Sequence, residues 1–283
     1  MTATSTTPAV DDLRQDRVQH GPFDTHYLES GVSDGPPVLL IHGSGPGVSG
    51  RANWQGLMRS PLADGRRLLA PDVVGFGETR AADGVELDHD TRVRHLLGFL
   101  DALGLDQVDV VGNSMGGALA LALAHRHPER IRRMVLMGAV GIDFPITEGL
   151  DRVWGYTPSH DNMAALMRLF AYDQGLVTDE LIELRFRATE VGDVQERYAT
   201  AFAAPRQRHI TAMALTEDEL ASIQTPTLLI HGRDDQIIPL EATSQRLLHI
   251  LPSADLVVFH RCGHWTQIER AEDFQRHVAG FFS

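Results

Sequence analysis

Six short apolar runs, separated by segments with helical patterning, constrain the fold of this chain more than any other feature. The runs occupy residues 37–43, 66–72, 108–113, 131–138, 225–232 and 254–261. Nearly continuous apolar runs of this length are typical of strands that are covered on both faces, as in a parallel sheet. Strands that alternate with helices predict an α/β fold, with a mostly parallel sheet flanked by helices.

The segments between these runs carry the period of amphipathic helices. In residues 91–105 the apolar side chains recur at i, i+3, i+4 and i+7, so they share one helix face, and Gly104 supplies a C-terminal stop. Residues 118–130 predict a helix that ends before Pro128. Residues 272–282 predict a last helix at the end of the chain.

One long region breaks the alternation. Residues 143–212 show helical patterns and no strand pattern, which predicts a helical lid inserted into the α/β domain. The core of this α/β domain is then expected in two pieces, 21–142 and 213–283. Residues 1–20 are rich in Thr and Asp, and they predict a flexible N-terminal arm.

The composition excludes several classes of partner. The formal net charge of −13 and a pI near 5.4 argue against binding to nucleic acid or to an anionic membrane, because both need clustered Lys and Arg. No apolar run reaches the roughly 18 residues of a membrane span, and no basic start precedes an apolar core at the N-terminus. A cytoplasmic location is the expectation, and the single cysteine, Cys262, suits a reducing compartment.

The stretch from Gly112 to Gly116 fits the G-x-S-x-G pattern of a nucleophile elbow. It follows a predicted strand and opens a predicted helix, which is the context that this motif requires. Ser114 is therefore a candidate nucleophile, and the backbone N–H of Met115 is a candidate oxyanion donor at the helix N-terminus. The alternative is a strand-to-helix turn in which the glycines are only structural.

A nucleophilic serine needs a base, and the base needs an orienting carboxylate. In this fold both follow the serine along the chain, each just beyond a strand. The run ending at residue 232 is followed by Asp234 and Asp235, and the last run is followed by His264 in a glycine-containing loop. Other late histidines are expected on helix surfaces, in a strand or in packing: His249, His277, His260 and His231.

A second oxyanion donor is expected from the loop after an earlier strand. The glycine-rich stretch 41–47, which begins Ile-His-Gly-Ser, provides such a loop, and Ser44 is its candidate N–H donor. The glycines would let the backbone approach a ligand closely, although His42-Gly43 could also be a simple tight turn.

Four segments together resemble the α/β-hydrolases, and specifically the meta-cleavage-product hydrolases, which cleave carbon–carbon bonds in aromatic catabolism. The resemblance rests on LLIHGSGPGVSGRANW, GNSMGG, HGRDDQIIPLEA and RCGHWTQIE. The phrases FPITEGLDRVWGY and LVTDELIELRFRA are similar to those of 2-hydroxymuconate semialdehyde hydrolases. No cofactor is expected, because the sequence has no glycine-rich nucleotide motif after a strand and no metal-ligand spacing. A homodimer is expected from the family alone.

The resemblance implies roles for individual residues. Ser114 would be the nucleophile, His264 the base and Asp235 the acid, since the family's acid is the fourth residue of the G-x-x-D stretch that begins at Gly232. Four further residues match positions that line the polar end of the substrate: Asn53, Asn113, Arg185 and Trp265.

Arg185 is also favoured by its own surroundings. On a predicted helix it shares a partly apolar face with Leu181 and Ala188, and a carboxylate substrate of an acidic protein needs a guanidinium partner. Arg187 is the competing residue, because the phase of the helix decides which arginine faces the pocket.

The expected substrate is an anionic dienoate from ring fission, most simply 2-hydroxymuconate semialdehyde, which would yield 2-hydroxypenta-2,4-dienoate and formate. A 6-alkyl homologue would yield a longer acid. Two mechanisms stay open, direct attack by Ser114 and activation of water. Two other functions also stay open: a carboxylesterase that uses the same residues, and a non-catalytic protein that binds a ligand on the same fold.

Overall fold

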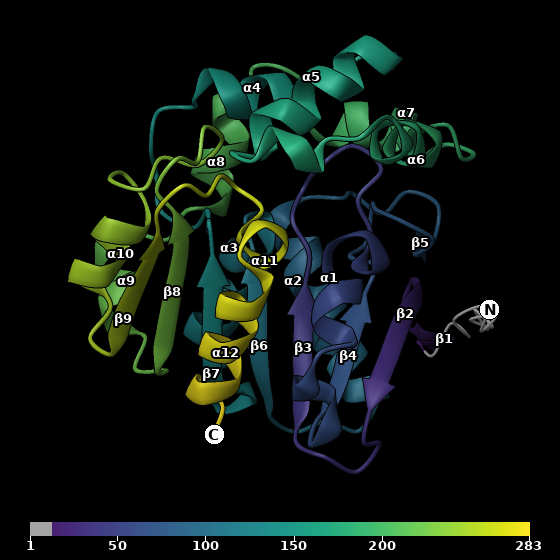
Figure 1. Ribbon diagram of the computed structural model, residues 1–283. Coiled ribbons are helices and arrows are strands. Elements are labelled where there is room, and N and C mark those ends of the chain that lie inside the picture. The colour runs from purple at the N-terminus through teal and green to yellow at the C-terminus, as the bar shows by residue number, and fades with distance from the viewer. Residues whose placement is uncertain (1–12) are drawn as a thin grey trace, which may run out of the picture.

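The computed structural model describes residues 13–283 and shows one twisted sheet with helices on both faces (Figure 1). Along the sheet the strands follow the order β1, β2, β4, β3, β6, β7, β8 and β9, and β5 pairs with β2. The pairs from β4 to β9 are parallel, while β1, β2 and β5 pair antiparallel. The bounds are β1 Arg14–His20, β2 Phe23–Gly31, β3 Pro37–Ile41, β4 Arg67–Pro71, β5 Arg80–Ala81, β6 Val108–Asn113, β7 Ile131–Met137, β8 Thr227–Gly232 and β9 Ala254–Phe259.

The predicted α/β class and all six predicted strands are confirmed. The helices that flank the sheet are α1 Gly50–Met58, α2 His89–Ala102, α3 Met115–Arg126, α9 Glu217–Ser222, α10 Ser244–Ile250, α11 Thr266–Glu269 and α12 Ala271–Phe281. Short 3-10 turns lie at Pro61–Asp64, Pro128–Arg130 and Gln174–Leu176.

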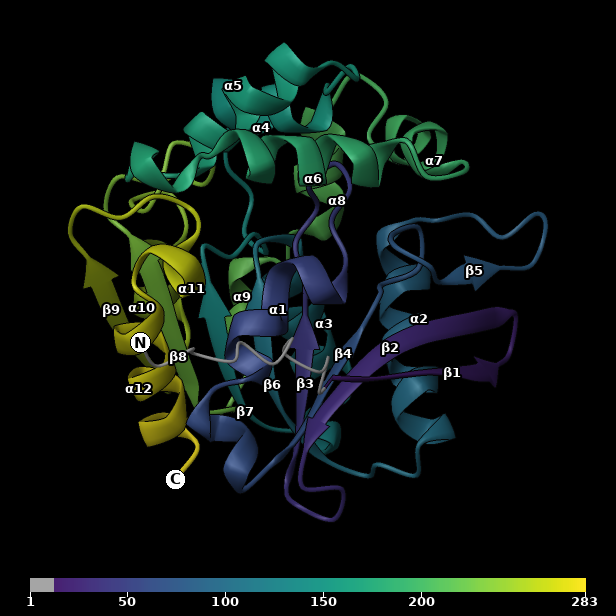
Figure 2. The same cartoon turned by 45° about the vertical axis from the view of Figure 1, so that its right-hand side comes forward.

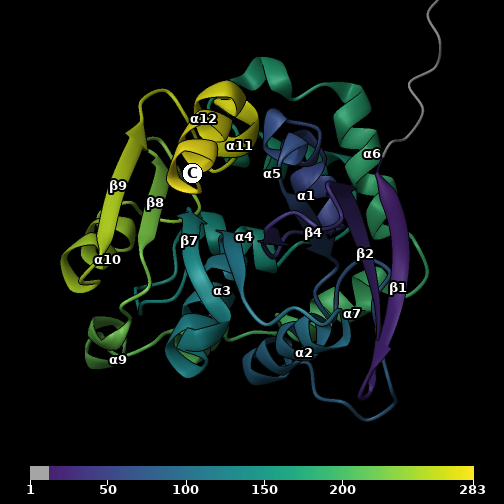
Figure 3. The ribbon, with the colours of Figure 1, turned by 90° about the horizontal axis from the view of Figure 1, so that it is seen from below.

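Two apolar layers form the core, one on each face of the sheet. Successive side chains of a strand point to opposite faces. In β3, Leu39 and Ile41 therefore belong to the layer that includes side chains of α2, α3 and α10, while Val38 and Leu40 belong to the layer that includes side chains of α1 and α12. Figure 3 shows this division from below, with α1 and α12 on one side of the sheet and α2 and α3 on the other.

The helix predicted over 91–105 is α2, which begins slightly earlier than expected. Asp88 caps its N-terminus by accepting a hydrogen bond from the N–H of Thr91. The predicted apolar face is buried at Val93, Leu96 and Leu100. Gly104 has a φ of +65°, a conformation that favours glycine and that ends the helix as predicted.

The prediction of a flexible arm over 1–20 is wrong for its last seven residues. Arg14–His20 is strand β1, which pairs with β2 in the register Arg14↔Glu29 to His20↔Phe23. The pattern was missed because this edge strand is mostly exposed and polar, so it carries no apolar run. The rest of the predicted arm, residues 1–12, lies outside the described residues.

Six helices lie between β7 and β8, and the last of them, α9, flanks the sheet. The five before it are α4 Glu148–Trp154, α5 His160–Phe170, α6 Asp179–Thr189, α7 Val194–Ala201 and α8 Gln207–Met213. We call them the cap helices. Figures 1 and 2 show them above the carboxyl ends of the parallel strands, which is where ligands gather in open α/β sheets. Within residues 13–283, no helix has both the length and the apolar character that crossing a bilayer requires.

Candidate active site

Ser114 occupies a sharp turn between the end of β6 and the start of α3. Its φ of +55° and ψ of −115° lie outside the regions that L-residues usually adopt, and such strain is typical of a nucleophile elbow. The turn needs glycine on both sides. A Cβ on Gly112 would lie 2.6 Å from the carbonyl oxygen of Gly116, and a Cβ on Gly116 would lie 2.2 Å from that of Ile41.

His264 and Asp235 form a direct pair in the loops that follow β9 and β8. His264 Nδ1 lies 2.7 Å from Asp235 Oδ2, so the ring donates Nδ1–H to the carboxylate and Nε2 is left as the basic nitrogen. The backbone N–H of His264 donates to the carbonyl of Phe170 at 2.8 Å. The end of α5 therefore helps to hold the histidine loop.

Asp235 is almost completely buried, and its second oxygen is held by the backbone. Oδ1 accepts hydrogen bonds from the N–H groups of Ile237 and Ile238, at 2.8 and 3.0 Å. Burial by itself would raise the pKa of Asp235, but the charge of His264 and hydrogen bonds from His231 and His264 outweigh it and hold this pKa far below its usual range. The carboxylate is therefore ionised at neutral pH.

Of the two neighbouring aspartates that the sequence offers, Asp235 contacts His264. The carboxylate of Asp234 points elsewhere, and its Oδ2 accepts from the N–H of Cys262 at 3.3 Å. His231 is buried, as expected, and its ring contacts Ser244, the carbonyl of Ile238 and, at 3.4 Å, the carboxylate of Asp235. His249 is exposed, as expected. His260 is also exposed, but it lies just after β9, which ends at Phe259, and not within the strand.

The loop after β3 lies against the elbow. A Cβ on Gly43 would lie 3.2 Å from Ser114 Cβ, so the backbone of this loop passes directly beside the candidate nucleophile. Ser44 is buried, and its hydroxyl accepts a hydrogen bond from Trp154 Nε1 at 2.9 Å. The cap helix α4 is thus bonded to the loop that carries the candidate oxyanion donor.

A single pocket brings together most of the residues singled out from the sequence. Those that line it are Ser44, Asn53, Asn113, Ser114, Arg185, His264 and Trp265. The remaining two lie just behind its wall: Asp235 contacts His264, and the Met115 side chain is buried in the core while its backbone begins α3. Apolar side chains from the cap and from neighbouring loops complete the wall: Val48, Leu150, Val153, Met167, Phe170 and Ile237.

Comparison with known proteins assigns the fold family. A family model described as the alpha/beta hydrolase fold matches residues 36–271. The 2-hydroxy-6-oxo-2,4-heptadienoate hydrolase of Pseudomonas putida is 52% identical over 263 residues, which cover 93% of this chain and 94% of that protein. The chain belongs to the α/β-hydrolases.

Further relatives place this α/β-hydrolase among the meta-cleavage-product hydrolases. The 2-hydroxymuconate semialdehyde hydrolase of Pseudomonas sp. strain CF600 is 50% identical, with 92% of this chain and 90% of that protein covered. The solved structure of a meta-cleavage product hydrolase from Pseudomonas fluorescens IP01 matches with a TM-score of 0.92 at 47% identity, and covers 94% of this chain and 97% of that one.

The structure shows which of the two arginines on α6 of this hydrolase faces the pocket. Arg185 on α6 lines the pocket, and burial lowers its pKa to about 10, so the guanidinium stays charged at neutral pH. Its Nη2 donates a long hydrogen bond, 3.5 Å, to the carbonyl of Ala52. Arg187 is exposed and pairs with Glu183 on the same helix.

Two asparagines of the hydrolase form a polar corner beside the elbow. Asn113 Nδ2 donates to Asn53 Oδ1 at 2.9 Å, and that same oxygen accepts a long hydrogen bond of 3.4 Å from the N–H of Gly43. Asn53 Nδ2 and Asn113 Oδ1 are buried and have no partner within the described chain. One donor and one acceptor thus remain available to a ligand. Trp265 closes this side by stacking on Phe170, with ring centroids 5.2 Å apart.

Sequence reasoning missed two residues of the pocket region. Gln267 lines the pocket from α11, and its Oε1 is buried without a partner in the described chain. Trp154 of α4 contacts Ser44 from the cap. Gln267 lies two positions beyond Trp265, within the segment RCGHWTQIE, so the position of this segment next to His264 could have indicated that Gln267 lines the pocket. Nothing in the sequence near Trp154 indicates a contact with a loop 110 residues earlier.

Proposed function

We propose that this chain hydrolyses a carbon–carbon bond in a meta-cleavage product of aromatic degradation, with Ser114, His264 and Asp235 as its catalytic residues. The observation that carries the proposal is one pocket that holds both the elbow serine and the partly buried, charged guanidinium of Arg185. A carboxylate is the natural partner of such a guanidinium, because a cation held away from water without a counterion is costly. An anionic dienoate supplies that carboxylate, whereas a simple neutral ester does not.

The polar corner supports the same orientation of the substrate. With the carboxylate at Arg185, the free donor of Asn53 and the free acceptor of Asn113 would meet the oxygen on the neighbouring carbon. Trp265 would pack against the conjugated chain. The opposite end of the substrate would then reach Ser114 and the oxyanion donors of Ser44 and Met115.

The chemistry begins with a proton transfer, because cleavage of the carbon–carbon bond requires an electron sink. The dienol is converted to its keto form by protonation at C5, and His264 is the group placed to move that proton. The 2-oxo group and its conjugated double bond can then accept the electron pair that the broken bond releases.

Attack at the C6 carbonyl follows. Ser114 adds directly or activates water, with His264 accepting the proton and the N–H groups of Ser44 and Met115 holding the oxyanion. Collapse breaks the C5–C6 bond and expels 2-hydroxypenta-2,4-dienoate. With 2-hydroxymuconate semialdehyde and one water, the second product is formate; with a 6-methyl substrate it is acetate.

The substrate that we favour has a small group at C6. The most similar relatives above are named for a semialdehyde and for a heptadienoate, whose C6 groups are hydrogen and methyl. Large cap side chains border the pocket of this chain, including Met167 and Phe170. We also propose that the enzyme works in the cytoplasm, as a homodimer.

The test is turnover of ring-fission products by the purified protein. Loss of the yellow absorbance would be followed with hydrogen, methyl and phenyl at C6, and release of p-nitrophenol from its acetate would be followed in parallel. We expect kcat/KM to be highest for hydrogen or methyl, and Ser114→Ala to abolish turnover. Fast ester hydrolysis without loss of the ring-fission product would instead identify a carboxylesterase. Wild-type rates in Ser114→Ala would contradict both.

A further inference from the structure

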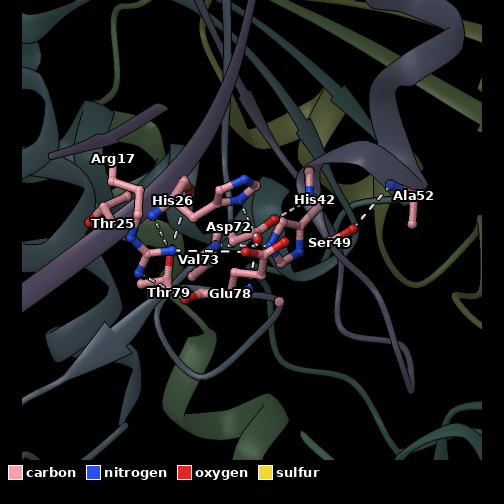
Figure 4. A network of polar contacts seen from close by, with 12 residues as sticks. Arg17, Thr25, His26, His42, Ser49, Ala52, Asp72, Val73, Glu78 and Thr79 are labelled. Atoms are coloured by element: carbon pink, nitrogen blue, oxygen red, sulfur yellow. Dashed lines mark hydrogen bonds and ion pairs between the residues drawn. The ribbon is translucent and has the colours of Figure 1, made fainter. Parts of the chain in front are cut away.

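His42 is a buried histidine beside the candidate nucleophile for which the proposed mechanism has no use. Its ring is completely buried at the end of β3, where Phe76 packs edge-on against it with ring centroids 5.3 Å apart. Figure 4 shows His42 beside Val73 and Asp72, in a network that continues to His26 on β2. Water does not reach the ring, so its hydrogen bonds are those that the protein supplies.

Both ring nitrogens of His42 have backbone partners, and together these partners define the tautomer. The N–H of Val73 can only donate, and it lies 2.9 Å from Nε2, so Nε2 carries no proton. Nδ1 must then carry the proton, and it donates to the carbonyl of Gly43 at 2.7 Å. Burial lowers the pKa of His42 despite the attraction of Asp72 and the bond to Gly43, so the ring stays neutral at neutral pH.

The bond from His42 to Gly43 determines where the next N–H points. The carbonyl of Gly43 and the N–H of Ser44 belong to one peptide group, which is planar and trans. In a trans peptide these two groups point in opposite directions. Because His42 holds the Gly43 oxygen on the core side, the N–H of Ser44 is directed away from the core, and Ser44 lines the pocket beside Ser114.

We propose that His42 is a positioning residue, which aims the Ser44 N–H at the developing oxyanion by holding the Gly43 carbonyl. This inference rests on the proposed function in one respect, the role of Ser44 as an oxyanion donor. It assigns to the histidine of the Ile-His-Gly-Ser stretch a purpose beyond a tight turn. His42 neither touches the substrate nor exchanges a proton during the reaction.

Two substitutions separate the two hydrogen bonds of the ring. His42→Asn places an amide nitrogen near the position of Nδ1, so it keeps the donor to Gly43 and loses the acceptor for Val73. His42→Gln reaches the position of Nε2, so it keeps that acceptor and loses the donor to Gly43. Each variant loses one buried hydrogen bond, and a purely structural role for His42 predicts similar losses of activity in both.

The positioning role predicts different losses. Removal of one oxyanion donor typically costs about 10²–10³-fold in kcat. We expect His42→Gln to lower kcat by about 10²-fold with little change in KM, and His42→Asn to recover most of that loss. The affinity of His42→Gln for benzeneboronic acid, which mimics the tetrahedral oxyanion, should fall in step with kcat, while the affinity for 2-hydroxypenta-2,4-dienoate should stay near that of the wild type.

The matched control is His95→Gln, because His95 is an equally buried histidine on α2, where its ring bonds to Thr25 away from the pocket. It should leave kcat and boronate affinity unchanged. Equal loss of kcat in His42→Gln and His42→Asn, or an effect on KM alone, would overturn the proposal. If the wild type hydrolyses only p-nitrophenyl acetate, the proposed function fails, and a selective loss of that esterase kcat in His42→Gln still supports the role of His42.

A measurement on the wild type covers the case in which the variants do not fold. In protein labelled with ¹⁵N-histidine, His42 should show the Nδ1–H tautomer with a proton protected from exchange, and this signal should not titrate between pH 7 and 9, because burial lowers the pKa of the ring. The Nε2–H tautomer, or titration of this ring within that range, would refute the assignment.

Discussion

Arg185 and Arg187 lie close together on α6, but the helix places their side chains in different surroundings. They are two residues apart on α6, and side chains with this spacing do not share a helix face. One guanidinium therefore lies in the pocket beside the elbow, and the other lies in solvent with Glu183 as its partner. The two arginines form a matched pair for mutation.

We expect Arg185→Gln to raise KM for the ring-fission product by about 10²-fold, because loss of one partner from a desolvated charge pair commonly costs several kcal/mol. The same change should have little effect on KM for neutral p-nitrophenyl acetate. Arg187→Gln is the control, and steady-state kinetics on both substrates is the measurement. Equal sensitivity of the two arginines would exclude Arg185 as the carboxylate partner.

Asp235 makes stability depend on pH. Its pKa in the folded protein lies far below the ordinary value of 3.8, so the folded state favours the ionised form. The resulting stabilisation is fully present above about pH 4 and is lost as the pH falls toward the folded pKa.

Thermal unfolding between pH 3 and 7 should therefore show a melting temperature that falls more steeply at the acidic end in the wild type than in Asp235→Asn. Parallel curves for the two proteins would mean that other carboxylates dominate the acid response. At neutral pH the same variant should also lose most of its kcat, since the amide no longer orients His264 in the Nδ1–H tautomer.

At the scale of elements, the cap helices and the loop after β3 meet through few polar contacts. Trp154 Nε1 donates to Ser44 Oγ, and the Tyr198 hydroxyl, which donates to the Val153 carbonyl of α4 at 2.8 Å, lies 3.5 Å from the Ser44 carbonyl. Stacking on Phe202, with ring centroids 5.0 Å apart, keeps the indole of Trp154 in place. The position of α4 and the conformation of the oxyanion loop are thereby linked.

Trp154→Phe removes the N–H and keeps most of the aromatic stacking. We expect kcat to fall by about tenfold with a smaller change in melting temperature, because the loop becomes less well ordered around Ser44. Trp54→Phe is the matched control, since Trp54 on α1 is fully buried in the apolar layer that α1 and α12 cover, on the other face of the sheet. It should lower stability and leave kcat almost unchanged. A larger loss of kcat in Trp54→Phe would argue against the link through α4.

The burial of the strands explains why some of them could be predicted from the sequence and others could not. Strands β3, β6, β7 and β8 are buried on both faces, so their sequences are nearly continuous apolar runs. Strand β1 is largely exposed, and it is held by backbone pairing with β2 and by the Arg14–Glu29 ion pair. Such interactions leave no hydrophobic period in the sequence.

For the whole molecule, the cap helices and the sheet share one apolar core. Cap side chains such as Met163 and Tyr198 belong to the same buried cluster as Leu119 of α3 and Val110 of β6. No separate apolar core within residues 13–283 belongs to the cap helices alone. The insertion is therefore expected to unfold together with the sheet.

Equilibrium unfolding in urea should show one transition, with coincident midpoints by far-UV circular dichroism and by tryptophan fluorescence. The three tryptophans suit this test, since Trp54 reports on α1, Trp154 on the cap and Trp265 on the pocket. An earlier fluorescence transition that Trp154→Phe abolishes would show that the cap melts on its own.

The sequence by itself determined the fold class, six of the strands, the elbow at Ser114 and the order of serine, acid and histidine along the chain. These features follow from local patterns: buried strands require apolar runs, and a strained turn requires glycines where the backbone approaches itself. The resemblance already favoured Asp235 over Asp234, and the structure brings Asp235 to His264. Only the tertiary structure decided that Arg185 rather than Arg187 faces the pocket, and that His42 holds the Gly43 carbonyl. Each of these depends on side-chain direction and on partners distant in sequence, which are defined only once the sheet and the cap have packed.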